Sequence, residues 1–162
     1  MGEFSIRPAG PDDIEPILDQ LEAIAEERKW ISSEPPIPRA RYRESIVRSL
    51  EDDYSLVIVA GYDDALIGEL SALGRAGHAA NIGMSVAKEW RGRGVGTALM
   101  AACVDWARAS DVHKLGLQVW PHNEAALRLY ERFGFEREGV LRSHYRRQNG
   151  ELWDAIVMGL LL

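Results

Sequence analysis

The feature that most constrains this chain is a glycine-rich stretch, residues 86–97, between an apolar segment and an amphipathic one. The apolar segment, residues 79–87, has the composition of a largely buried strand. The segment after the glycines has apolar residues on one helical face, namely Val95, Leu99, Ala102 and Trp106. The chain must therefore pass from a strand into a helix through a short turn. Gly92, Gly94 and Gly96 allow that turn to be tight and to come close to a ligand.

A turn of this kind, opening a helix, predicts a binding site for an anion. The first N–H groups of a helix have no carbonyl partner within it, and the helix dipole favours negative charge there. Arg91 and Arg93 add guanidinium groups, which suit phosphate oxygens. We therefore expect a phosphate cradle over residues 91–97; a tight connection without a ligand is the alternative.

Two common phosphate motifs do not fit this stretch. A P-loop requires Gly-Lys-Ser/Thr, which does not follow the glycines. The dinucleotide motif Gly-x-Gly-x-x-Gly requires a third glycine, but Thr97 stands there when counted from Gly92, and Leu99 when counted from Gly94. No acidic residue stands at the end of the next strand to bind a ribose. Another carrier of a pyrophosphate is favoured, and nicotinamide dinucleotide binding is the weaker alternative.

Length and composition indicate one globular domain over residues 1–162. The net charge of −6 argues against a nucleic-acid partner, because such domains are usually basic. The apolar runs are too short for a membrane span and the N-terminus does not have the layout of a signal peptide, so we expect a cytoplasmic protein. The single cysteine, Cys103, lies among apolar residues of the expected helix and is interpreted as a buried structural thiol.

Periodicity and turn residues predict a mixed α/β fold. We expect strands near residues 4–7, 54–60, 65–73, 79–87, 114–120, 135–147 and 152–160. We expect a helix that is capped by Asp12 or Asp13 and fades at residues 26–29, and a second helix near residues 39–50. We expect a third helix after the cradle and a fourth from Asn123 as N-cap to Gly134 as C-cap. The strand at 114–120 follows a helical crossover and must run parallel to the strand before the cradle. The remaining neighbours read as hairpins, the last of them turning at Asn149-Gly150.

Two segments carry a family likeness. The segment Arg91-Gly-Arg-Gly-Val-Gly matches the acyl-CoA motif (Gln/Arg)-x-x-Gly-x-(Gly/Ala) of the GNAT N-acetyltransferase superfamily. Residues 123–135 resemble its second hallmark, Asn-x-x-Ala-x-x-Leu-Tyr-x-x-x-Gly-Phe. The two lie in the family's order and separation, and the element order is also that of the family, so the resemblance covers nearly the whole chain. Residues 30–35 and 145–159 look like those of a bacterial branch that includes L-amino-acid N-acetyltransferases.

The resemblance implies a central, mostly antiparallel sheet with one splayed parallel strand pair, flanked by about four helices. It implies acetyl-CoA as acyl donor and no metal. Backbone amides would hold the pyrophosphate at Arg91, Gly92, Arg93, Gly94, Val95, Gly96 and Thr97. The strand end at Met84, Ser85 and Val86 would pair with the pantetheine arm, which Asn123 and Ala126 would also contact. Tyr130 would stand beside the thioester sulfur and protonate the departing thiolate.

The chemistry requires a neutral amine, donors for an oxyanion, and a proton or donor for the thiolate. A backbone N–H near Val86 is the candidate donor for the oxyanion. With ordinary pKa values, full proton transfer from a tyrosine to a thiolate is uphill by about 2 kcal/mol, so a hydrogen bond serves as well as acid catalysis. Glu69, in the middle of a strand, is the candidate base, and a solvent-facing carboxylate is the alternative. His78 is a second candidate, acting through water; His113, His122 and His144 have no metal-ligand spacing.

The expected acceptor is a small primary amine such as an amino acid, because an α-amine is more easily neutral at pH 7 than a lysine side chain. The candidate acceptor-binding residues are Trp30, Glu34, Tyr42 and Glu69. Arg142, Arg146 or Arg147 would bind an acceptor carboxylate, or simply alternate on an exposed strand. Alternatives are a protein or peptide N-acetyltransferase and a regulatory acyl-CoA-binding domain. The apolar end, residues 155–162, permits a homodimer without requiring one.

Overall fold

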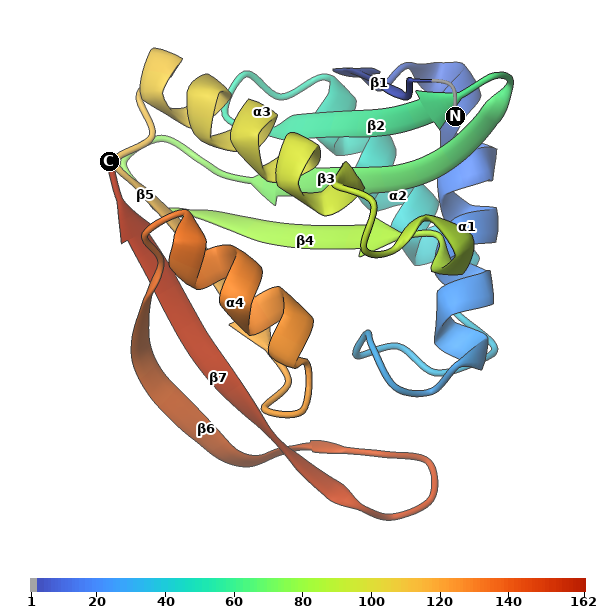
Figure 1. Ribbon diagram of the computed structural model, residues 1–162, viewed down its shortest axis with the longest axis vertical. Helices are drawn as coiled ribbons and strands as arrows, with labels where there is room; N and C mark the ends of the chain where they lie inside the picture. Colours follow the sequence, from blue (N-terminus) through green and yellow to red (C-terminus); the bar gives the residue numbers. More distant parts are fainter. Residues whose placement is uncertain (1–2) are drawn as a thin grey trace.

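The computed structural model describes residues 3–162, which form one seven-stranded sheet with helices on both faces (Figure 1). The strands are β1 (Ser5–Pro8), β2 (Leu56–Tyr62), β3 (Ala65–Leu73), β4 (Ala80–Val86), β5 (Lys114–Val119), β6 (Glu136–Arg146) and β7 (Leu152–Leu161). The α-helices are α1 (Ile14–Glu26), α2 (Arg39–Leu50), α3 (Val95–Ala109) and α4 (Glu124–Arg132). The strand order is β1-β2-β3-β4-β5-β7-β6, and only β4 and β5 are parallel. The expected fold is confirmed.

Alternate residues of β2 show how the sheet holds its two layers of helices. Val57 and Val59 point to one face, where they pack with Ile17 and Leu18 of α1 and with α2. Ile58 and Ala60 point to the other face, where α3 and α4 cover the larger core (Figure 1). This alternation follows from the two-residue period of a strand, and it buries apolar side chains on both faces. In the part of the chain that the structure describes, no helix has the length and apolar character needed to span a membrane.

The parallel pair opens soon after it begins. β4 and β5 are paired only at Ala80 with Leu115 and at Asn81 with Gly116. Beyond that point β4 stays paired with β3 as far as Val86, and β5 stays paired with β7 as far as Val119. The sheet therefore splits between two strands that remain well supported on their outer sides. The splayed pair expected from the resemblance is confirmed.

The glycine-rich turn contains two residues in left-handed backbone conformations. Gly92 has φ of 72° and Gly94, the N-cap of α3, has φ of 86°, values that cost any residue with a Cβ more than they cost glycine. Gly96 differs from the expectation, because it lies inside α3 rather than in the turn. A Cβ on Gly96 would stand 3.4 Å from Leu129 Cδ2, so its lack of a side chain allows α3 and α4 to pack closely.

Candidate active site

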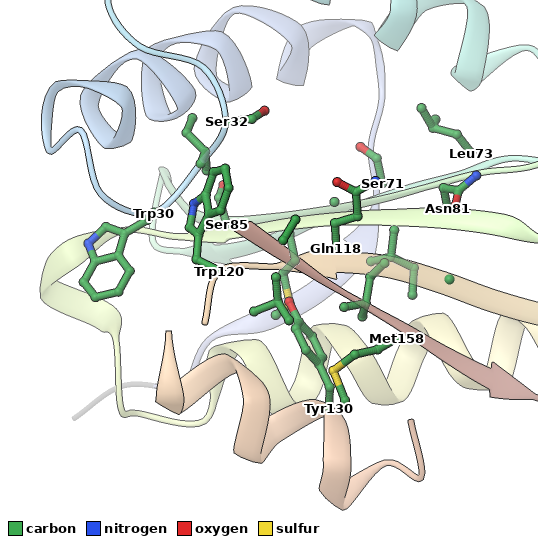
Figure 2. A pocket seen from close by; sticks show the side chains of 18 of the residues that line it. Trp30, Ser32, Ser71, Leu73, Asn81, Ser85, Gln118, Trp120, Tyr130 and Met158 are labelled. Carbon is green, nitrogen blue, oxygen red and sulfur yellow. The ribbon is translucent and has the colours of Figure 1, made fainter. Parts of the chain in front are cut away.

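A cavity of about 600 Å³ lies at the split between β4 and β5. Its walls come from α1, α2, residues 30–32, the strands β3, β4, β5, β7 and β6, and Tyr130 of α4. Figure 2 shows Tyr130 entering from the α4 side, with Trp30 and Ser32 at the opposite side of the cavity. Helices on opposite faces of the sheet thus contribute to one space, which is possible because the strands separate there.

Glu69 is buried in this cavity rather than facing solvent, with 5% of its surface exposed. It stands in β3 directly opposite Ser85 of β4. The Ser85 hydroxyl donates to Glu69 Oε1 at 2.9 Å, and the Ser71 hydroxyl donates to Oε2 at 3.4 Å. Burial raises the pKa of Glu69 to about 7, although both hydrogen bonds oppose the rise. A carboxylate with a pKa near 7 can accept a proton at neutral pH and still release it, as a general base must.

Tyr130 lies on the buried face of α4 and lines the same cavity. Its ring packs against Phe135 with 5.8 Å between the ring centroids. Burial raises the pKa of Tyr130 to about 12, so the phenol stays protonated throughout the neutral range. Full transfer of its proton to a thiolate of ordinary pKa would be uphill by about 5 kcal/mol. The hydroxyl is therefore suited to donate a hydrogen bond to a developing negative charge rather than to lose its proton.

The start of α3, where we expect the phosphate cradle, leaves backbone N–H groups without partners in the helix. The first hydrogen bond of the helix joins Ala98 N–H to the Gly94 carbonyl at 3.0 Å. The N–H groups of Val95, Gly96 and Thr97 precede that bond and have no carbonyl partner in the helix. They therefore present three donors at the positive end of the helix dipole.

The side chain of Arg91 links this turn to Glu27 and to the end of β4. Its Nη1 and Nη2 donate to the Glu27 carboxylate at 2.9 and 2.6 Å, and its Nε donates to the Val86 carbonyl at 3.1 Å. The hydrogen bonds from Arg91 hold the pKa of Glu27 below its ordinary value. The sequence suggested a phosphate contact for this guanidinium, whereas the structure commits it to α1 and β4. The Arg93 guanidinium carbon lies 5.3 Å from the centre of the Trp90 ring.

Some of the other residues expected at the cofactor line the cavity, and the rest lie outside its lining. Met84, Ser85 and Asn123 line it together with Tyr130, whereas Val86, Ala126 and the cradle are outside its lining. Asn123 is the N-cap of α4, as predicted, since its Oδ1 accepts a hydrogen bond from Ala126 N–H at 3.3 Å. Val86, at the end of β4, and Arg91, in the cradle, are linked by the hydrogen bond described above. The cavity and the cradle are thus joined through the end of β4.

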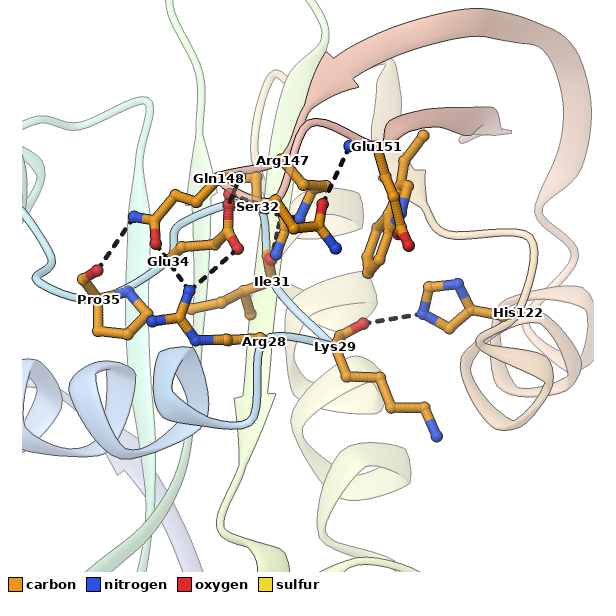
Figure 3. A network of polar contacts seen from close by, with 12 residues as sticks. Arg28, Lys29, Ile31, Ser32, Glu34, Pro35, His122, Arg147, Gln148 and Glu151 are labelled. Atoms are coloured by element: carbon orange, nitrogen blue, oxygen red, sulfur yellow. Dashed lines mark hydrogen bonds and ion pairs between the residues drawn. The ribbon is translucent and has the colours of Figure 1, made fainter.

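Of the residues expected to bind the acceptor, some line the cavity and one does not. Trp30 and Tyr42 line the cavity, but Glu34 does not. Glu34 instead accepts a hydrogen bond from the Gln148 backbone N–H at 2.8 Å and lies 3.6 Å from Arg147 Nε (Figure 3). Its carboxylate is therefore occupied in joining the proline loop, defined here as residues 30–38, to the turn between β6 and β7. The interpretation of Glu34 as an acceptor contact does not fit this geometry.

Arg147 is the centre of the same contact and is only 4% exposed. Its Nη1 donates to the Ser32 carbonyl at 3.0 Å and to the Ile31 carbonyl at 3.4 Å (Figure 3). Its guanidinium lies 4.4 Å from the centre of the Trp153 ring. Neither alternative considered from the sequence describes Arg147, because it neither lines the cavity nor alternates on an exposed strand. Arg142 and Arg146 are exposed.

The remaining candidates do not line the cavity. His122 contacts the Lys29 carbonyl at 2.8 Å, and His78 is an exposed turn residue. Within residues 3–162, no group of three His, Cys, Asp or Glu side chains is placed to hold a metal ion. Burial raises the pKa of the Cys103 thiol to about 12, which suits the structural thiol that was expected.

Sequence reasoning missed Gln20, Ser71, Trp120 and Tyr145, because their place at the site depends on strand register and on contacts between distant segments.

Comparison with known proteins identifies the class. Residues 20–135 match the model of the acetyltransferase (GNAT) family, and the chain belongs to this family of acetyl-CoA-dependent N-acetyltransferases. It is 35% identical over 109 residues to the L-amino acid N-acetyltransferase AaaT of Escherichia coli, a match that covers 62% of this chain and 65% of that enzyme. A ribosomal-protein-alanine N-acetyltransferase from Brucella melitensis superposes with a TM-score of 0.88 at 25% identity, covering 98% and 99% of the two chains. A phosphinothricin acetyltransferase from Sinorhizobium meliloti, solved with acetyl-CoA, has a TM-score of 0.86 at 20% identity over 98% and 88%.

Proposed function

We propose that this protein transfers the acetyl group of acetyl-CoA to the primary amine of a small molecule, by direct attack in a ternary complex. The observation that carries the proposal is the shared cavity at the split in the sheet, where a buried carboxylate, Glu69, and a buried phenol, Tyr130, come from different elements. A base and a donor around one space are what amine attack on a thioester requires.

The cofactor would lie along β4 and α3. Backbone amides of Val95, Gly96 and Thr97 would hold the pyrophosphate at the start of α3. Among residues 3–162, no strand pairs with the β5-facing edge of β4 beyond Asn81, so its backbone can pair with the pantetheine arm as a neighbouring strand would. Met84, Ser85 and Asn123 line the cavity along that path. The phosphinothricin acetyltransferase solved with acetyl-CoA supports this assignment through its shared fold.

The reaction then has two proton steps. Glu69 accepts a proton from the substrate ammonium, directly or through one water molecule, and the neutral amine attacks the thioester carbonyl carbon. The carbonyl oxygen becomes an oxyanion, for which a backbone N–H at the end of β4 is the donor. The intermediate collapses with loss of the CoA thiolate, which receives a hydrogen bond from the Tyr130 hydroxyl. The nitrogen passes its extra proton to the departing sulfur, directly or through water, and Glu69 releases the proton it took from the ammonium to solvent. The net products are an N-acetyl amine, CoA thiol and one proton.

Two observations favour a small acceptor over a polypeptide. The proline loop forms one wall of the cavity through Trp30, Ile31 and Ser32, and the buried side chain of Arg147 holds it in place. A peptide substrate would require an open groove at that position. The Escherichia coli relative is named for L-amino acids, and we propose that the acceptor of this chain is of that kind. The ribosomal-protein-alanine enzyme with the same fold makes protein N-termini the second candidate.

A thiol-release assay with acetyl-CoA and a panel of amines tests the proposal. The panel contains amino acids, simple alkyl and aryl amines, and peptides with free N-terminal or lysine amines. We expect turnover with small amines and at least 100-fold less turnover in Glu69→Gln at pH 7. Faster turnover with peptides than with every small amine would favour the second candidate. Tight acetyl-CoA binding with no turnover on any amine would instead identify a regulatory domain.

A further inference from the structure

A side chain of α1 reaches the candidate base through one intermediate residue. Gln20 Nε2 donates to the Ser85 hydroxyl oxygen at 2.8 Å and lies 3.4 Å from the Ser85 carbonyl oxygen. The Ser85 hydroxyl in turn donates to Glu69 Oε1 at 2.9 Å. All three side chains are buried, with 9% or less of their surfaces exposed. They form a chain of hydrogen bonds from α1 through β4 to β3.

The direction of the protons in this chain is determined by chemistry. A backbone carbonyl oxygen can only accept, so the NH₂ group of the Gln20 amide must face Ser85. A serine hydroxyl has a single proton. Because its oxygen already accepts from Gln20, that proton is directed to Glu69 Oε1. A donor held in this way stabilises the ionised form of Glu69 over the neutral form.

One polar atom of the Gln20 amide is not satisfied by the protein. Gln20 Oε1 is buried and accepts no hydrogen bond from any residue between 3 and 162. An unsatisfied buried oxygen is unfavourable for folding, and an apolar side chain of similar length would avoid it. The hydrogen bonds that this amide does make both go to Ser85, which links it to Glu69.

We propose that Gln20 is a positioning residue for the general base: through Ser85 it holds Glu69 Oε1 as an acceptor and leaves Oε2 for the substrate amine. This inference rests on the proposed role of Glu69. Oε2 has the weaker contact of the two oxygens, with the Ser71 hydroxyl at 3.4 Å. Glu69 also lines the cavity into which the amine must come.

The other ionisable groups around the cavity do not set the behaviour of Glu69. They are Tyr42 of α2, Lys114 of β5, Tyr130 of α4, and Glu138 and Tyr145 of β6. Lys114 and Glu138 neutralise one another at 2.6 Å, and Tyr145 donates to Gln118 at 2.7 Å. Burial and the hydroxyls of Ser85 and Ser71 are what move the pKa of Glu69.

The test is a double-mutant cycle read from pH profiles. For Gln20→Met, we expect the acidic limb of kcat/KM for the amine to move up by about half a pH unit, so that activity lost at pH 6.5 returns by pH 9. For Ser85→Ala, which removes the donor itself, we expect a move of about one pH unit. In the Ser85→Ala background, Gln20→Met should add nothing, because Gln20 acts through Ser85. A merely structural role would lower activity equally at every pH.

A second readout separates this inference from the proposed function. Infrared titration of the Glu69 carboxyl, assigned by the band lost in Glu69→Gln, follows the protonation of Glu69 without turnover. If the infrared titration is the same in Gln20→Met and wild type, the inference is wrong while the role of Glu69 stands. If the infrared titration moves but the kcat/KM profile does not, Glu69 is not the base, and the proposed role of Glu69 fails together with the inference. Ile24→Val, a buried change on the same helix away from the cavity, is the matched control and should leave both profiles unchanged.

Discussion

Glu27 and Arg91 form a bidentate ion pair, with Arg91 Nη1 and Nη2 at 2.9 and 2.6 Å from the two carboxylate oxygens. The same Glu27 carboxylate accepts a hydrogen bond from Trp30 Nε1 at 2.8 Å. One carboxylate after the end of α1 therefore joins the cradle turn to a residue that lines the cavity. The side chains of Glu27 and Arg91 are 25% and 31% exposed, so water weakens this pair only in part.

For Glu27→Gln we expect weaker binding of CoA, because the brace under the cradle turn loses its charge and one strong acceptor. The dissociation constant measured by calorimetry should rise about 5- to 10-fold, corresponding to about 1 kcal/mol. Glu44→Gln breaks an exposed ion pair with Arg48 on α2 and serves as the control, which should bind CoA as wild type does. Equal affinities in Glu27→Gln and wild type would show that the cradle does not depend on this pair.

For Tyr130→Phe we expect kcat to fall about 10- to 100-fold while the dissociation constant of CoA changes little. The substitution removes only the hydroxyl, and the ring can keep its packing against Phe135. Steady-state kinetics and calorimetry on the same preparation separate the two quantities. An unchanged kcat would remove Tyr130 from the mechanism.

Two glycines with similar backbone conformations provide a matched test of the cradle. Gly94 has φ of 86° at the start of α3, and Gly150 has φ of 89° in the turn between β6 and β7. An added Cβ meets nothing within 4 Å at either position, so both alanine variants should lose about 1 kcal/mol of stability from backbone strain alone. Only Gly94→Ala should also weaken CoA binding. The measurements are urea unfolding and CoA titration; comparable losses of CoA affinity in both variants would contradict the assignment.

The raised pKa of Glu69 has a consequence for stability. An unfolded glutamate with a pKa of 4.5 is ionised between pH 4.5 and 7, whereas buried Glu69, with a pKa of about 7, still holds its proton. The folded state therefore binds more protons in this window, and this group lowers stability as pH rises through it. Glu69→Gln should become more stable relative to wild type from pH 4.5 to 7, by on the order of 3 kcal/mol, and the difference should be constant above pH 8. Urea unfolding of both proteins in the same buffers measures this difference, and a difference that does not change with pH would place Glu69 in contact with water.

For Arg147→Lys we expect a higher KM for the amine with little change in the KM for acetyl-CoA. Lysine cannot reproduce the planar donor group that reaches the Ile31 and Ser32 carbonyls and lies against Trp153. The proline loop should then lose its attachment to the hairpin. Arg146→Lys, at an exposed neighbouring position, is the control and should have the same two KM values as wild type. If the KM for acetyl-CoA rises more than the KM for the amine, the proline loop is not part of the acceptor-binding site.

Local sequence determined much of this fold. The helix Arg39–Leu50 and the strand Ala65–Leu73 have the predicted bounds, and the others differ by a few residues at their ends. Gly92 and Gly94 were recognisable because left-handed turns favour glycine, and Asn123 because its side chain caps the helix that follows it. Each of these inferences depends on a few neighbouring residues only, which is why the sequence alone was sufficient for them.

The contacts between distant segments were not predictable in the same way. That Glu69 stands opposite Ser85 depends on the register between β3 and β4, where a shift of one residue would have placed Glu69 on the other face. The contact of Gln20 with Ser85 joins residues 65 positions apart, and that of Arg147 with Ser32 joins residues 115 apart. The sequence favours a phosphate contact for the Arg91 guanidinium, since its partner in the fold, Glu27, is 64 positions away.

The early separation of β4 from β5 has a further consequence for how an enzyme of this kind can work. A continuous sheet separates its two faces. Molecules bound on opposite faces could then meet only if part of the protein moved. With β4 and β5 separated beyond Asn81, the donor can enter along one face while the acceptor arrives from the other. Neither then blocks the other's exit, so the acyl group can pass directly between them without first being stored on a side chain of the protein.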